Sequence, residues 1–161
     1  MKLLVFADTH HSTRRMLQAA MKEREADACI HLGDGVADAD ALQTLFSPSA
    51  IYRVQGNCDY DSSDFEDRLV SFDHTLFFIT HGHHYGVKYG LEQLWQAARE
   101  SEAKVALYGH THMPHYEYTR GIHLFNPGSL NMPRGKAGPT YGIITLEAGQ
   151  MPKFDVVHYK V

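Results

Sequence analysis

The sequence has few cysteines and no long apolar run. Its 161 residues include two cysteines, Cys29 and Cys58, which form no CxxC pattern of the kind that binds structural zinc. We therefore expect reduced thiols rather than a disulfide framework. No apolar run approaches the ~20 residues of a membrane span, and the apolar stretch at residues 3–7 is too short for a signal peptide. These absences predict a cytoplasmic protein with no membrane partner.

The sequence also lacks an excess of basic residues. Lys and Arg number 15 against 19 Asp and Glu, which gives a formal net charge of −4. This balance argues against a strongly basic nucleic-acid-binding surface. No repeat, low-complexity segment or linker divides the chain, whose length suits one compact domain. We therefore expect a single domain over residues 1–161.

The first third of the chain alternates between apolar runs and amphipathic segments. Apolar runs at residues 3–7, 28–32 and 51–54 predict strands that are largely buried. Helices are predicted from residue 12, a serine suited to an N-cap, to residue 23, and from residue 38 to residue 46. This order of elements is typical of a parallel sheet with right-handed crossovers. The first helix has a core-facing stripe at helical spacing, made of Met16, Leu17, Ala20 and Met21.

The rest of the chain is richer in predicted strands. One amphipathic helix is expected at about residues 91–100, with Trp95 on its apolar face. A turn is expected over the Asn126–Pro127–Gly128–Ser129 stretch. The whole pattern belongs to the α/β class. Strands are predicted at residues 68–72, 76–80, 105–108, 116–119, 122–125, 141–146 and 154–159.

Side chains that can bind metal ions follow five of these strands directly. Because ligands bind beyond the carboxyl ends of strands in open α/β sheets, we expect the five loops to meet at one edge of a sheet. The most specific of the five is the Gly109–His110–Thr111–His112 stretch, where two imidazoles lie one residue apart. The candidate ligands are Asp8, His10, Asp34, Asn57, His81, His110 and His112.

The mixture of these ligand types indicates the kind of metal. Imidazole, carboxylate and a neutral amide oxygen suit borderline divalent ions such as Mn²⁺, Ni²⁺, Fe²⁺ or Zn²⁺. They match neither the all-oxygen shell of Ca²⁺ nor the thiolate shell of structural zinc. One carboxylate can bridge two cations, and two ions ~3.5–4 Å apart can activate a water molecule and clamp a phosphate.

Taken together, these motifs resemble the calcineurin-like metallophosphoesterase family over almost the whole chain, and the Asn126–Ser129 turn resembles its small YfcE-type phosphodiesterase subgroup. The family fold that this resemblance implies is a sandwich of two mixed β-sheets flanked by helices. The resemblance further implies that Asp34 bridges two metal ions. The first ion is then held by Asp8, His10 and His112, and the second by Asn57, His81 and His110.

One position departs from the pattern of many family members. They carry a histidine directly after the motif asparagine, where it assists the leaving group, and here Cys58 stands in that position. The YfcE-type proteins share this cysteine, so the departure fits the subgroup and leaves the general acid unidentified. His83 and Asp59 are the candidate catalytic residues, with His83 expected on the substrate side of the ligands.

The expected function is a phosphoesterase that uses two divalent ions, with Mn²⁺ favoured. We expect a small phosphodiester as substrate, hydrolysed by attack of a hydroxide that bridges the ions. Two alternatives stay open, a phosphomonoesterase of the same family and a non-catalytic interaction scaffold like Vps29 of the retromer coat. A nuclease is less favoured, because the chain has no obvious DNA-recognition domain. The sequence leaves homo-oligomer formation open.

The remaining histidines have plainer interpretations. His31 lies within a predicted strand and is expected to be a satisfied core or edge histidine. Three residues beside the motif loops, His11, His84 and Arg134, are as readily surface residues as parts of a substrate pocket. Turn, surface or strand positions without a function are expected for His74, His115, His123 and His158.

Overall fold

The computed structural model describes residues 1–160 and contains two five-stranded sheets. In the first sheet the strand order is β10-β9-β1-β2-β3, and β1, β2 and β3 run parallel to one another. Strand β9 is antiparallel to both β1 and β10, which makes the sheet mixed. Its strands are β1 (Lys2–Phe6), β2 (Ala28–His31), β3 (Ile51–Arg53), β9 (Thr140–Thr145) and β10 (Lys153–His158).

The second sheet has the order β4-β5-β6-β8-β7 and is also mixed. Strands β5, β6 and β8 are parallel, and the two edge strands pair with them as antiparallel hairpins. Residues Asn126 and Pro127 extend β8, so only the second half of the predicted Asn126–Ser129 turn lies outside a strand. The strands are β4 (Asp67–Phe72), β5 (Thr75–Thr80), β6 (Val105–Leu107), β7 (Pro114–Thr119) and β8 (Ile122–Pro127).

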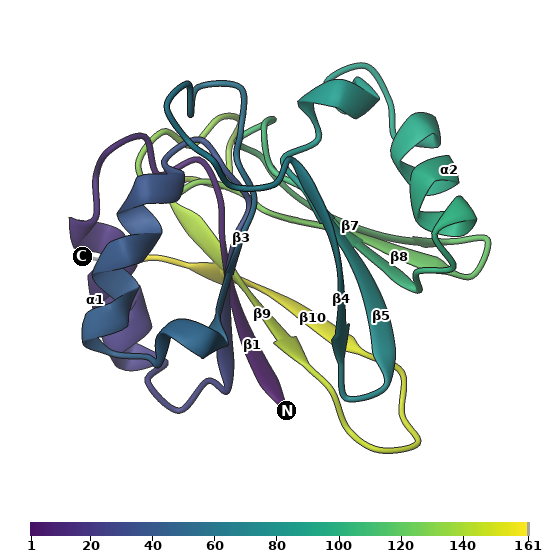
Figure 1. The fold of residues 1–161 in the computed structure, drawn as a ribbon, viewed down its shortest axis with the longest axis horizontal. Helices are drawn as coiled ribbons and strands as arrows, with labels where there is room; N and C mark the ends of the chain where they lie inside the picture. The colour runs from purple at the N-terminus through teal and green to yellow at the C-terminus, as the bar shows by residue number, and fades with distance from the viewer. Residues whose placement is uncertain (161) are drawn as a thin grey trace.

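Helices cover the outer faces of both sheets (Figure 1). Helix α1 (Arg14–Lys22) packs on the first sheet and α2 (Glu92–Glu100) on the second. The predicted helix at residues 38–46 is instead a 3₁₀ helix, η1 (Val36–Thr44). Two shorter 3₁₀ helices are η2 (Pro48–Ala50) and η3 (His83–Tyr85).

One predicted stripe needs correction. Met16 and Ala20 of α1 are buried as expected, but Met21 is 60% exposed and Ala19 is buried in its stead. Leu17 is only partly buried. The difference arises because α1 is short and begins at Arg14, so its buried face is a narrow stripe of one large and two small side chains.

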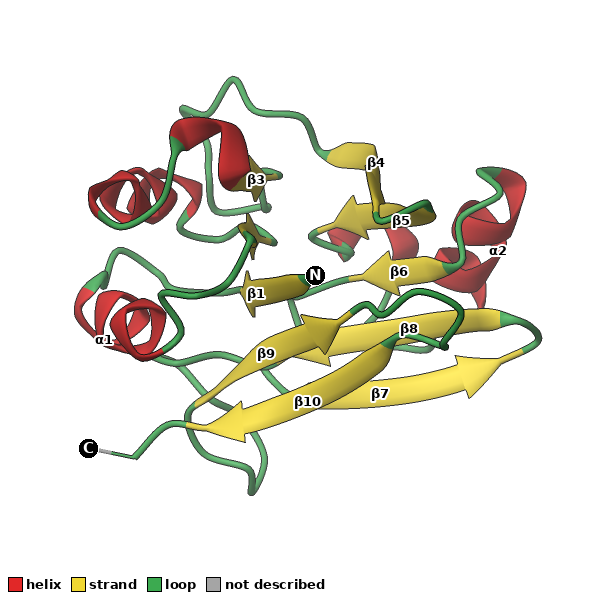
Figure 2. Ribbon diagram, turned by 90° about the horizontal axis from the view of Figure 1, so that it is seen from below, coloured by secondary structure: helices red, strands yellow, loops and turns green. Residues whose placement is uncertain are grey.

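The main core lies between the two sheets. It joins residues of β1 and β2 to residues of β5, β6 and β8, and the rings of Phe72 and Phe77 meet edge to face at 5.2 Å. Figure 2 shows the two sheets as layers, with β9 and β10 alongside β7 and β8. This arrangement confirms the predicted sandwich of two mixed sheets flanked by helices.

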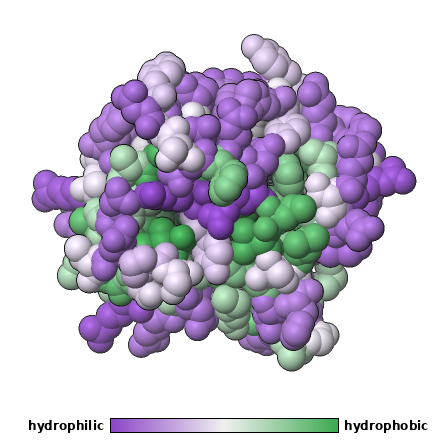
Figure 3. All heavy atoms as spheres, viewed as in Figure 1, coloured by the Kyte–Doolittle hydropathy of each residue, from purple (hydrophilic) through white to green (hydrophobic). Residues whose placement is uncertain are grey.

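The face of the molecule seen in Figure 3 is mostly hydrophilic. On the face shown in Figure 3, hydrophilic side chains form the outer rim and hydrophobic ones gather in two areas toward the middle. None of the helices within residues 1–160 has the length and apolar composition that a membrane crossing needs.

Candidate metal centre

The seven candidate ligands come together, but the loops that carry them belong to two sheets. Asp8 and His10 follow β1, Asp34 follows β2, and Asn57 follows β3 of the first sheet. The remaining three follow strands β5 and β6 of the second sheet. The expectation of a single sheet edge is therefore wrong, because the carboxyl ends of parallel strands from both layers point to the same end of the sandwich. We call this set of seven residues the metal centre.

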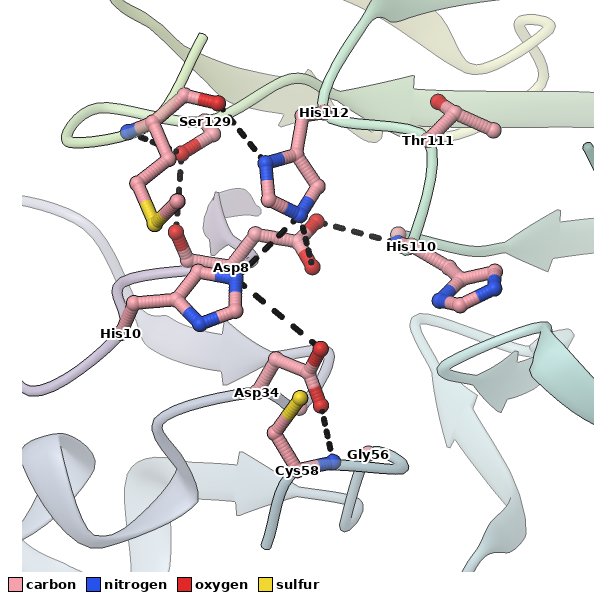
Figure 4. Close-up of polar contacts among 12 residues, drawn as sticks. Asp8, His10, Asp34, Gly56, Cys58, His110, Thr111, His112 and Ser129 are labelled. Atoms are coloured by element: carbon pink, nitrogen blue, oxygen red, sulfur yellow. Dashed lines mark hydrogen bonds and ion pairs between the residues drawn. The ribbon is translucent and has the colours of Figure 1, made fainter.

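Four residues of the metal centre form a first group of ligands. Asp8, His10, Asp34 and His112 each offer one ligand atom, and these atoms all lie within 4.8 Å of one another. The Nε2 atoms of His10 and His112 are 3.2 Å apart. The Nε2 atom of His112 lies 3.4 Å from Asp8 Oδ1, and that of His10 lies 3.9 Å from Asp34 Oδ2. Figure 4 shows these side chains converging from different loops.

A second group shares Asp34 with the first. The ligand atoms of Asp34, His81 and His110 also lie within 4.8 Å of one another. His81 Nε2 is 3.4 Å from Asp34 Oδ2, 3.2 Å from His110 Nδ1 and 3.1 Å from Asn57 Oδ1. Because Asp34 belongs to both groups, its carboxylate has the position needed to bridge two ions.

The loops reach this geometry through strained backbone. Five of the seven residues have a positive φ although none is glycine, a conformation that is uncommon outside turns and functional sites. It turns each side chain sharply out of the direction of its strand and toward the centre. The five are Asp8 (φ 54°), His10 (47°), Asp34 (53°), His110 (67°) and His112 (60°).

Two histidines are held in one tautomer by backbone carbonyls. His81 Nδ1 lies 2.7 Å from the Leu32 carbonyl oxygen, and His112 Nδ1 lies 2.7 Å from that of Met132. Because a carbonyl can only accept, Nδ1 carries the proton in both rings and donates it. The Nε2 atom of each ring then presents its lone pair to the centre, as metal-binding histidines usually do.

The centre holds two buried carboxylates, Asp8 and Asp34, whose charge a bound cation would offset. Asp8 Oδ1 is buried without a hydrogen-bond partner among the described residues. Burial, with the charge of Asp34 and against that of His81, raises the pKa of Asp8 to about 7. Burial would also raise the pKa of Asp34, but the hydrogen bond and charge of His81 lower it well below its usual range. A divalent ion would give the unpartnered oxygen a ligand bond and neutralise both carboxylates.

The histidines respond to the same charges. Burial would lower the pKa of His81, but its hydrogen bond to Asp34 and the charge of Asp8 raise it. Burial and the neighbouring charge of His81 lower the pKa of His110 to about 4, so that ring is neutral at pH 7. Because only the neutral imidazole binds metal, a bound ion would displace any proton that His81 holds on Nε2.

Asp59 holds two loops of the centre together. Its Oδ1 accepts hydrogen bonds from the backbone N–H groups of Gly35 and Val36, and its Oδ2 accepts from those of Asp34 and Gly56. Both carboxylate oxygens are thus occupied by donors. This geometry favours a positioning role for Asp59, and its predicted catalytic role stays a prediction.

Polar residues at the end of β8 and in the loop after it fix the other side of the centre. Asn126 donates to the Gly109 carbonyl oxygen, Ser129 Oγ to that of Asp8, and Asn131 Nδ2 to those of Thr9 and Ser12. The sequence predicts Asn126 and Ser129 only as parts of a turn and gives no indication of Asn131. An asparagine in a polar loop carries no local signal of the contacts of Asn131, which join it to residues more than 100 positions away.

The other residues near the centre occupy its rim. The ring of His83 lies 5.4 Å from that of His81, and burial and the charge of His84 lower its pKa. His84 is exposed and pairs with Glu66, whereas His11 is exposed beside Cys58 in a separate hollow. These positions leave His83 as the candidate nearest to the ligands.

A comparison with protein families shows which family the chain matches. Residues 1–149 match the model of the calcineurin-like phosphoesterase superfamily domain. The chain belongs to this family. Members of the family use divalent metal ions, and the metal centre supplies suitable ligand groups for them.

Curated relatives agree with this assignment. The probable metallophosphoesterase YsnB of Bacillus subtilis is 34% identical over 91% of this chain and 85% of its own length. The phosphodiesterase YfcE of Escherichia coli K12 is 30% identical over 89% of this chain and 87% of its own length. Both matches span nearly the whole chain, so the relationship extends well beyond the ligand motifs.

Solved structures share the fold. A predicted phosphoesterase of Streptococcus pneumoniae superposes with a TM-score of 0.81 at 27% identity, covering 98% of this chain and 88% of that one. Vps29 of Entamoeba histolytica, solved in complex with Zn²⁺, has a TM-score of 0.77 at 20% identity and covers 98% of each chain. At that level of identity the Vps29 match shows a common fold only.

Proposed function

We propose that this chain is a phosphodiesterase that hydrolyses a small phosphodiester with two divalent ions bound at the metal centre. The observation that carries the proposal is the sharing of Asp34 between two groups of ligand atoms. Asp8, His10 and His112 would hold one ion, Asn57, His81 and His110 the other, and Asp34 both. Mn²⁺ is our first choice of ion, with Ni²⁺, Fe²⁺ and Zn²⁺ as alternatives.

The bound ions would supply an activated water and neutralise charge on the phosphate. Other residues of the chain hold the ligand side chains in the orientation that this chemistry needs. The carbonyls of Leu32 and Met132 hold His81 and His112 in the tautomer that binds metal, and the Cys58 N–H fixes Asp34 through a hydrogen bond of 2.8 Å to Oδ1. His83 lies on the rim, with its ring 5.4 Å from that of His81, where it can contact the substrate.

The absence of an evident proton donor favours some substrates over others. The lowered pKa of His83 leaves its ring neutral at pH 7 and thus a poor acid. Both oxygens of Asp59 already accept hydrogen bonds. A phosphoesterase built in this way suits substrates whose leaving group departs readily.

The alternative functions differ in the ligand positions and in the substrate that they require. An interaction scaffold of the Vps29 kind does not need all its ligand positions filled, whereas all seven are filled here with suitable side chains. A phosphomonoesterase would use the same centre on a different ester, and an aryl monoester assayed beside the diester separates the two.

Homo-oligomer formation, a cytoplasmic location and a single domain over the whole chain stay predictions.

The variant Asp34→Asn tests the proposal. An amide has a single acceptor oxygen and no charge, so it cannot hold two cations close together. We expect loss of turnover on an aryl phosphodiester and less metal bound at both positions. Asp61→Asn is a matched control, because Asp61 is exposed on the neighbouring loop. Near-normal metal content and turnover in Asp34→Asn would overturn the proposal.

A further inference from the structure

A third group of metal-binding side chains lies beside the metal centre. Glu66, His83 and His84 each offer one ligand atom, and these atoms lie within 4.8 Å of one another. His84 Nε2 is 3.1 Å from Glu66 Oε2, and the rings of His83 and His84 are 3.9 Å apart. We call these three residues the rim cluster. None of them belongs to the seven residues of the metal centre.

The fold brings the rim cluster together from two places. His83 and His84 open the 3₁₀ turn η3, which begins after Gly82 at a φ of 102°. Glu66 lies immediately before strand β4, which pairs with β5, the strand that leads into the turn. A hydrogen bond of 2.6 Å from Tyr85 to Asp67 ties the same two segments together. The cluster is therefore a product of the sheet and not of sequence proximity alone.

The donor set of the rim cluster is that of a transition-metal site. Two imidazoles and one carboxylate are the ligands of a common class of zinc sites that keep a fourth position open. The Nδ1 atom of His83 is buried and has no hydrogen-bond partner within residues 1–160. A buried polar atom without a partner costs free energy, and a bond from His83 Nδ1 to a ligand would offset this cost.

A second histidine–glutamate pair on the surface serves as a comparison for the rim cluster. His115 and Glu117 approach to 3.4 Å and are exposed to a similar degree as His84 and Glu66. No second imidazole joins that pair among the groups found within residues 1–160. A histidine and a glutamate that merely form a surface ion pair need no third partner, whereas the rim cluster has one.

We propose that the rim cluster is a third metal site, separate from the two-ion centre. It takes a borderline divalent ion such as Zn²⁺ or Ni²⁺ in preference to Mn²⁺ or Mg²⁺, because two of its three ligands are imidazoles. The ring of His83 lies 5.4 Å from that of His81 and 6.1 Å from that of His110. A cation bound there adds positive charge at the edge where a phosphate ester would approach.

Anomalous diffraction at the zinc edge tests this site directly. Crystals of the whole chain with Zn²⁺ should show a peak between Glu66, His83 and His84, apart from any peaks at the metal centre. Glu66→Gln and His84→Ala should lose this peak only, because both side chains are about half exposed and their loss leaves the fold intact. His115→Ala should keep it.

A count of zinc per chain by equilibrium dialysis checks the result in solution. We expect one equivalent less in Glu66→Gln and His84→Ala than in wild type and in His115→Ala. Absence of the rim peak in wild-type crystals exposed to Zn²⁺, or an unchanged count in both variants, would overturn the proposal. A rim peak without peaks at the metal centre would instead contradict the two-ion function and leave this site standing.

Discussion

The Cys58 side chain lies beside the metal centre, but its thiol is poorly suited to act as a general acid or base. Burial, followed by the charge and hydrogen bond of Asp34, raises the pKa of its thiol to about 11. The thiol is therefore neutral at pH 7, and a neutral thiol is a weak hydrogen-bond donor. The residue contacts the centre through its backbone N–H, which donates to Asp34 Oδ1, and through its Sγ, which lies 3.5 Å from Asn57 Nδ2. Any residue other than proline would keep the backbone hydrogen bond.

The first prediction concerns the leaving group. A positioned general acid contributes ~10²–10⁴-fold to a rate, and most when the leaving group is poor. Because no such acid is evident here, we expect turnover to fall steeply as the leaving-group pKa rises across a series of aryl and alkyl phosphodiesters. Cys58→Ala should change these rates little, with metal content as the control. A flat dependence, or loss of turnover in Cys58→Ala with metal intact, would show that an acid is present.

His31 is a buried neutral histidine that supports the loop after β1. The Gly33 N–H donates to its Nδ1, so the proton sits on Nε2 and is donated to Thr9 Oγ1, which in turn donates to Asp38 at 2.5 Å. Burial lowers the pKa of His31 to about 4, against the opposing charges of Asp38 and Asp59. Its ring is therefore charged in the unfolded chain but neutral in the folded one across mildly acidic pH.

The second prediction follows from this difference. Between the ordinary histidine pKa of about 6.5 and the folded value of about 4, the unfolded state binds a proton that the folded state does not. The free energy of unfolding should therefore fall by about 3 kcal/mol as the pH is lowered through this window, at about 1.4 kcal/mol per pKa unit. His31→Gln keeps an acceptor and a donor but cannot titrate.

Urea unfolding of metal-free wild type and His31→Gln at a series of pH values measures this term. Both proteins share every other titrating group, so only the difference between them is compared. That difference should change by about 3 kcal/mol between pH 7 and pH 4. Parallel curves for the two proteins would contradict the assignment of a neutral His31.

At the scale of elements, the metal centre depends on loops that are joined to each other. The loop after β2 and the loop after β3 are fastened by one carboxylate, that of Asp59, through four backbone N–H groups. The close approach of the same loops leaves no room for side chains. A Cβ atom on Gly56 would lie 2.2 Å from Asp34 Oδ1, and one on Gly33 would lie 2.5 Å from the Gly56 nitrogen.

The third prediction tests this fastening with Asp59→Asn. An asparagine has only one acceptor oxygen. Its NH₂ group would face backbone N–H donors that the second carboxylate oxygen accepts from in the wild type. We expect the free energy of unfolding of the metal-free protein to fall by about 2 kcal/mol, in line with the loss of hydrogen bonds to a charged group. Metal affinity should fall as well, because the Asp34 N–H is one of the four donors.

Asp61→Asn is the control, since it removes a charge from the same loop at an exposed position. Denaturant unfolding and metal titration of both variants separate the contribution of the four hydrogen bonds from that of net charge. Equal stability of Asp59→Asn and Asp61→Asn would mean that Asp59 does not fasten the loops. Retained stability with lost turnover would return Asp59 to the catalytic role.

How far the sequence predicts these elements depends on the range of the contacts. Strand β1 and the ligands Asp8 and His10 follow from an apolar run and the residues directly after it. The 3₁₀ form of η1 was not predicted, because its Ala- and Asp-rich segment lacks a periodic apolar stripe. The contact of Glu66 with His84 was missed for another reason, since it depends on the pairing of β4 with β5.

At the scale of the whole molecule, the site exists because two layers end at the same place. The first sheet supplies four ligands and the second supplies three, and neither sheet alone holds both groups. The sequence does not show which strands share a sheet, because apolar runs look alike in either layer. This is why the convergence of the candidate ligands could be predicted while their origin from a single sheet edge was wrong.

The central claim is that two ions at the metal centre make this chain a phosphodiesterase. Stripped protein is titrated with Mn²⁺, which binds weakly to an exposed imidazole-rich site such as the rim cluster, while turnover of an aryl phosphodiester is measured. We expect no turnover without metal and a rise that saturates at about two equivalents per chain. Bound metal without turnover, or full turnover at one equivalent, would contradict it.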